Sequence, residues 1–114
     1  SRADALRASK PDRAIELYER ALRDAPEELE ALWKLATLLD ERKLADRAAG
    51  TYRRVLSLAH YLGVAEDPRL EQARARAQAL EPAWRAWVQA RERYAEEALR
   101  LAKRYQDDEL PRMA

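Results

Sequence analysis

Two stretches of the chain, DRAIELYERALRDAP at residues 12–26 and ADRAAGTYRRVLSLAH at residues 45–60, share one rhythm of small and aromatic residues. The aligned pairs, each 34 residues apart, are Ala14 and Ala48, Tyr18 and Tyr52, and Ala21 and Val55. A fixed period in this range is typical of a repeated unit of two helices. The two stretches therefore predict one helical hairpin that is used twice.

Composition favours a helical domain over a β-fold. The chain has 114 residues, enough for one domain with a modest core. Charged residues make up 38% of the chain, which suits helices with one buried stripe and a charged outer face. Two glycines and no asparagine leave few of the turn residues that β-hairpins need. We expect an all-α fold.

Proline and glycine positions suggest the helix boundaries. We expect a short helix over residues 1–8 and a second helix that begins at Pro11 and ends before Pro26. A third helix is expected to begin at Pro26 and the acids that follow it. The fourth is expected over residues 44–62, closed by a left-handed Gly63. Apolar residues at spacings of three and four support the second, third and fourth of these helices.

The chain beyond Asp67, a predicted N-cap, follows a different pattern. Positions spaced alternately three and four apart run from Leu70 to Tyr105, and Arg91 is the only charged residue among them. Such a seam belongs to one long helix or to a helix pair. Its unbroken phase favours one helix kinked at Pro82, whereas a proline in a first turn favours two helices, and we expect two.

At the aligned residues the chain resembles the tetratricopeptide repeat family, whose unit of about 34 residues is a helix-turn-helix hairpin. The resemblance covers about residues 1–60 in two copies and leaves the C-terminal half unmatched. It implies a solenoid of about two repeats with a long or kinked C-terminal helical element. It also implies a structural, repeat-packing role for these residues: Ala14, Tyr18, Ala21, Leu35, Ala36, Ala48, Tyr52 and Val55.

We expect one domain in three parts. Residues 1–63 form the repeats, residues 64–107 form a helical capping or interaction element packed on them, and residues 108–114 form a frayed tail. Solenoids usually need at least about three repeats for stability, so the C-terminal element is expected to supply the missing packing. Its candidate capping or self-association residues are aromatic: Trp84, Trp87 and Tyr94.

In the family that the chain resembles, the concave surface of the first helices often binds peptides. The resemblance places four peptide-groove candidates on the third helix: Glu30, Trp33, Thr37 and Asp40. A tryptophan ringed by acids suits an apolar or basic peptide, and the alternative is that Trp33 packs on the preceding helix. We expect a non-enzymatic protein–protein interaction module or scaffold that binds a peptide or protein partner.

Two other functions stay open. The Trp-rich helix over residues 70–105 suits self-association as a homodimer, and its basic face suits nucleic-acid binding. Arginines alternate with glutamates on that face, so nucleic acid is the weaker of the two expectations. The net charge of +1 gives no global field toward nucleic acid or an anionic membrane.

Motifs for catalysis or cofactor binding are missing from the sequence. There is no cysteine, the one histidine, His60, stands at a helix end, and neither a glycine-rich phosphate loop nor a nucleophile motif is present. We therefore expect no enzyme activity, no metal and no cofactor. No long apolar run and no leader peptide is visible. This favours the cytoplasm without identifying the compartment.

Overall fold

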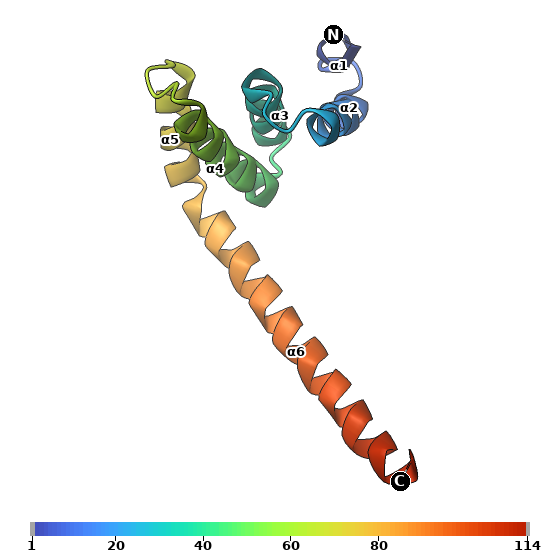
Figure 1. Ribbon diagram of the computed structural model, residues 1–114. Coiled ribbons are helices and arrows are strands. Elements are labelled where there is room, and N and C mark those ends of the chain that lie inside the picture. The colour runs from blue at the N-terminus through green and yellow to red at the C-terminus, as the bar shows by residue number, and fades with distance from the viewer. Residues whose placement is uncertain (1, 114) are drawn as a thin grey trace. The chain divides into compact units, whose positions relative to one another are not determined.

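The computed structural model describes the backbone of residues 2–113 and the side chains of residues 2–107. All regular elements in that part of the chain are helices, which confirms the all-α prediction (Figure 1). They are α1 (Arg2–Leu6), α2 (Pro11–Asp24), α3 (Leu29–Glu41), α4 (Ala45–Leu62), α5 (Arg69–Ala79) and α6 (Glu81–Met113). One compact unit extends to Trp84, and α6 from Arg85 onward forms a second.

Helices α1 to α5 pack against one another in chain order, α1 on α2, α2 on α3, α3 on α4 and α4 on α5 (Figure 1). Short connections between them make sequence neighbours into spatial neighbours. This is the arrangement of stacked helical hairpins, in which each unit contacts only the next.

The core of this first unit lies where the two aligned stretches meet α3. Ala14 and Ala48 are 0% exposed, and Tyr18 and Tyr52 are 3% and 2% exposed. The alanines allow the helices to approach closely, and the tyrosine rings fill the space beside them. The other buried repeat-packing residues are Leu35, Ala36 and Val55.

Ala21 differs from the rest of the repeat-packing set. It is exposed on α2, although the residue that aligns with it, Val55, is buried on α4. Leu22 is buried beside it and belongs to the core cluster. The two hairpins are thus equivalent at their first alanine and tyrosine but not one turn later.

Two helices are closed at their C-terminal ends by a left-handed residue. Gly63, with φ of 71°, closes α4 as expected, and the N–H of the next residue donates to the carbonyl of Ala59 at 3.0 Å. The same pattern closes α3, where Lys43 has φ of 61° and the following N–H donates to the carbonyl of Leu39 at 3.0 Å. This motif favours glycine, because a Cβ is strained in the left-handed region. Lys43 therefore occupies a glycine position with a residue that does not suit it.

The predicted start of the third helix at Pro26 is wrong. Pro26 lies in a turn, and α3 begins at Leu29. The N–H of Glu28 donates to the carbonyl of Ala25 at 3.2 Å and closes that turn. A residue before proline is driven away from the helical region, so the chain bends here before a helix can form.

The seam beyond residue 67 forms two helices, as expected. Helix α5 is closed by Leu80, and Pro82 lies in the first turn of α6. Helix α5 begins at Arg69, whose backbone N–H donates to the Asp67 carboxylate at 2.9 Å. The side chains of the expected tail, residues 108–114, lie outside the described residues, and the backbone is helical to Met113. Over the described residues, none of the helices has an apolar stretch that could cross a membrane.

Candidate functional site

A hollow of about 430 Å³ opens beside α1 and α3, and we call it the groove. Three of the four groove candidates line it, namely Glu30, Trp33 and Thr37. Asp40 is not among its lining residues. Sequence reasoning missed the other lining residues: Asp4, Arg7, Lys34 and Arg69.

Trp33 is the aromatic surface of the groove. Its side chain is half-buried, and its ring meets that of Tyr52 on α4 edge to face, with centroids 5.9 Å apart and planes 64° apart. Edge-to-face packing is a favourable aromatic geometry. Trp33 therefore packs on the following helix while it also lines the groove.

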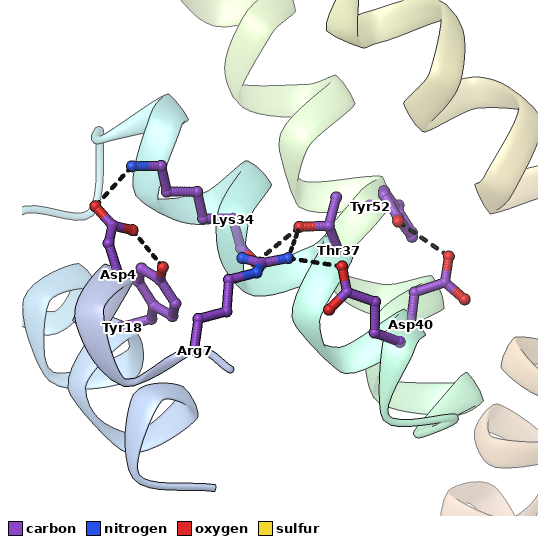
Figure 2. Close-up of polar contacts among 8 residues, drawn as sticks. Asp4, Arg7, Tyr18, Lys34, Thr37, Asp40 and Tyr52 are labelled. Atoms are coloured by element: carbon purple, nitrogen blue, oxygen red, sulfur yellow. Dashed lines mark hydrogen bonds and ion pairs between the residues drawn. The ribbon is translucent and has the colours of Figure 1, made fainter. Parts of the chain in front are cut away.

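One wall of the groove is held by a carboxylate shared between two partners. The Tyr18 hydroxyl donates to Asp4 Oδ1 at 2.5 Å, and Lys34 Nζ donates to Asp4 Oδ2 at 2.9 Å. Figure 2 shows Asp4 between these two side chains, so α1, α2 and α3 meet at one acid. Burial and the Asp4 hydrogen bond raise the pKa of Tyr18, and the Asp4 hydrogen bond raises the pKa of Lys34. Tyr18 stays neutral and Lys34 stays charged at neutral pH.

A second shared carboxylate links the next set of helices. The Tyr52 hydroxyl donates to Asp40 Oδ2 at 3.0 Å (Figure 2), and Arg76 of α5 donates to both Asp40 oxygens at 2.7 and 2.8 Å. The Arg76 hydrogen bond, joined by that of Tyr52, lowers the pKa of Asp40 against the opposing effect of burial. Asp40 thus joins α3, α4 and α5.

The two clusters follow the same plan. In each, the tyrosine of an aligned stretch donates to an aspartate of the preceding odd-numbered helix, and the next odd-numbered helix supplies the cation. The plan joins α1 to α3 through Asp4 and α3 to α5 through Asp40. These polar links hold the groove-forming helices at fixed spacing, because both tyrosines are anchored in the core.

Arg7 ties the segment after α1 to α3. Its guanidinium donates to the carbonyl of Lys34 at 2.8 Å and to Thr37 Oγ1 at 2.6 Å (Figure 2). It also donates to Glu41 Oε1 at 3.2 Å. Burial opposes the charge of Arg7, but hydrogen bonding with Tyr18 and with Glu41, together with the nearby Glu41 charge, raises its pKa overall. The groove candidate Thr37 is therefore an acceptor for Arg7 as well as a lining residue.

The charge of the groove differs from the acidic ring expected from sequence. Its lining has three basic side chains, Arg7, Lys34 and Arg69, and two acidic ones, Asp4 and Glu30. Lys34 could have been placed in the groove from helical spacing, because it lies four residues after Glu30 and residues four apart are neighbours on a helix surface. Arg7 and Arg69 lie far from α3 in sequence, so no local pattern could have placed them there.

Trp84 lies in the first unit, against α4. A Cβ at Gly50 would lie 2.9 Å from Cζ3 of its indole, and the Arg53 guanidinium lies 4.9 Å from its ring centroid. Gly50, which sequence reasoning missed, is thus the position that lets this indole approach the helix. The sequence could have indicated this position, because a glycine inside an amphipathic helix often marks a close packing contact.

The other two predicted aromatic residues of this set lie in the second unit. Trp87 is half-buried, and the Arg91 guanidinium lies 4.8 Å from its ring centroid. Tyr94 is 75% exposed. Among the described residues, no group of three histidine, cysteine, aspartate or glutamate side chains gathers as a metal site would require.

Comparison with known protein families identifies the family of the repeats. A model of the tetratricopeptide repeat family matches residues 4–63, and the C-terminal part of the chain is unmatched. The matched segment covers more than half of the chain and both aligned stretches. Searches of curated proteins and of solved structures found no match.

Proposed function

Because the chain belongs to the tetratricopeptide repeat family, whose repeats are generally protein–protein interaction modules, we propose that it binds a peptide segment of a protein partner in the groove. Binding is stoichiometric, with no chemical step. The observation that carries the proposal is the gathering of Glu30, Trp33 and Thr37 in one hollow.

The groove is preorganised for a partner. Trp33 is held against Tyr52, and the charged side chains around it are held by in-chain hydrogen bonds to Asp4 and from Arg7. Side chains that are already fixed lose little conformational entropy when a partner arrives. An apolar side chain of the partner can pack on Trp33, as aromatic anchors do in other interfaces.

The lining also supports a particular partner chemistry. Both oxygens of Asp4 already accept hydrogen bonds inside the chain, so Glu30, whose side chain is 67% exposed, is the main acid available to a partner. Against it stand three basic side chains, each paired with an acid inside the chain but with more N–H donors than that pair uses: Arg7, Lys34 and Arg69. We therefore favour a segment with an apolar anchor beside acidic residues, whereas the sequence pattern led us to expect an apolar or basic peptide.

Selection from a phage-displayed library of random dodecamer peptides on the immobilised chain tests this function. We expect recovered peptides to share an apolar or aromatic residue flanked by aspartate or glutamate. Their affinity should rise several-fold for Glu30→Lys, because the change removes the exposed acid, while Glu27→Lys makes the same charge change on an exposed residue that does not line the groove. Recovery of basic peptides, or an equal effect of both variants, would contradict the proposal.

A further inference from the structure

The second unit carries an exposed apolar stripe on α6. Tyr94, Leu101 and Tyr105 are 75%, 54% and 63% exposed, and Ala98 between them is exposed as well. These residues recur at spacings of four, three and four, which places them on one face of the helix. A unit that consists of a single helix has no second layer of its own to cover such a face.

We propose that this stripe pairs with the same stripe of a second copy of the chain, with the two α6 helices antiparallel. Alanines at positions 95, 98 and 102 lie on or beside the stripe and allow two helices to approach closely. Arg91 sets the orientation. In a parallel pair the two copies of Arg91 would meet at the same level of the seam, whereas an antiparallel pair separates these like charges.

Charges beside the stripe fit one antiparallel register. Glu97 and Arg104 each stand one position before a stripe residue, so they lie on the same flank, seven residues apart. When the two-fold axis passes between residues 99 and 100, Glu97 of each copy faces Arg104 of the other, and the symmetry makes this pair twice. A shift of one heptad would instead set Glu97 against its own copy. The register also sets these stripe residues against one another: Ala98 against Leu101 and Tyr94 against Tyr105.

The pairing is independent of the proposed groove function, because it uses none of the groove residues. Sedimentation velocity of the full chain over a range of micromolar concentrations tests it. We expect a dimer whose dissociation constant rises about tenfold for Glu97→Arg or for Arg104→Glu, since each reversal turns two attractive pairs into two repulsive ones. The double variant Glu97→Arg with Arg104→Glu restores the pairs and should return to within about twofold of the wild type.

A matched control uses Glu96→Arg and Lys103→Glu. These make the same changes of charge at the same separation, one position earlier and on the side of α6 away from the stripe, so the dimer should not change. Far-UV circular dichroism checks that every variant keeps its helix content. A wild type that is monomeric throughout overturns the proposal. So does a dimer that ignores both single reversals, that the double variant fails to restore, or that responds equally to the control pair.

Discussion

Asp40 offers the sharpest test of how the repeats hold together. Its carboxylate accepts the hydroxyl of Tyr52 at 3.0 Å and the guanidinium of Arg76 at 2.7 and 2.8 Å. Replacing it with alanine removes the acceptor of a tyrosine that is 2% exposed. The change therefore leaves a core hydroxyl without a hydrogen-bond partner, and it also removes the bridge to α5.

The expected cost follows from these contacts. A buried hydroxyl that loses its acceptor costs about 1–3 kcal/mol, and the ion pair with the 45% exposed Arg76 adds about 0.5 kcal/mol after solvent screening. Alanine in place of aspartate in a helix returns about 0.5 kcal/mol through helix propensity. We expect Asp40→Ala to lower the free energy of unfolding by about 2 kcal/mol. Asp40→Asn keeps an acceptor for Tyr52 and should cost roughly 1 kcal/mol.

Urea unfolding followed by circular dichroism measures these differences. In a Tyr52→Phe background the hydroxyl is absent, so the cost of Asp40→Ala should fall by about 1–2 kcal/mol, which is the coupling between the two residues. Glu41→Ala is the matched control, because Glu41 is the next residue, is 62% exposed and pairs with Arg7 at the surface, and we expect a change within about 0.5 kcal/mol. An Asp40→Ala cost no larger than that of the control, or equal costs in both backgrounds, would show that this carboxylate does not hold the helices together.

Three further predictions concern single positions. Asp40 has a lowered pKa in the folded chain. Its charged form therefore contributes to folding stability above its unfolded pKa of about 3.9, and this contribution is lost as the pH falls through the lower folded value. The difference in unfolding free energy between wild type and Asp40→Asn, measured by urea titration, should close on acidification, and a constant difference would contradict this. Lys43→Gly should raise the free energy of unfolding by about 0.5–1 kcal/mol, because a φ of 61° strains any residue that has a Cβ. The melting temperature should rise by several degrees. Lys43→Ala keeps that strain and should give no such rise. Gly50→Ala should raise the free energy of unfolding by less than the roughly 1 kcal/mol that helix propensity alone would give, because the new Cβ would lie 2.9 Å from the Trp84 indole. The full gain in stability should appear in a Trp84→Ala background. Equal gains in the two backgrounds would rule out the contact.

The repeat could be predicted because its residues are constrained locally. Tyr18 and Tyr52 fill the same space in successive hairpins, and the 34-residue period follows from that packing. Gly63 was predictable for a similar reason, since a left-handed helix end favours glycine. The predicted helix start at Pro26 was wrong because a proline suits both the first turn of a helix and a loop. Here a hydrogen bond across the loop, from Glu28 to Ala25, stabilises the loop.

The groove could be predicted only in part. Positions on one helix share a face through their spacing, so Glu30, Trp33 and Thr37 could be grouped from the sequence alone. Asp40 follows the same spacing, yet its carboxylate is taken by Tyr52 and Arg76. Those partners lie on other helices. A sequence period indicates which residues share a face of one helix, but it does not indicate which polar side chains of different helices meet. For the same reason the basic lining residues, and with them the favoured charge of a partner, emerge only from the fold.

Backbone amide mapping by nuclear magnetic resonance, with a selected acidic peptide titrated into the isotope-labelled chain, locates the binding surface without assuming it. We expect the largest shift changes on residues that line the groove, above all Trp33 and Thr37 with the adjoining Arg7. We also expect Thr37→Glu, which brings a like charge to the acidic peptide, to weaken binding about tenfold or more. Shift changes confined to the outer faces of α2 and α4, with unchanged affinity for Thr37→Glu, would contradict binding in this groove.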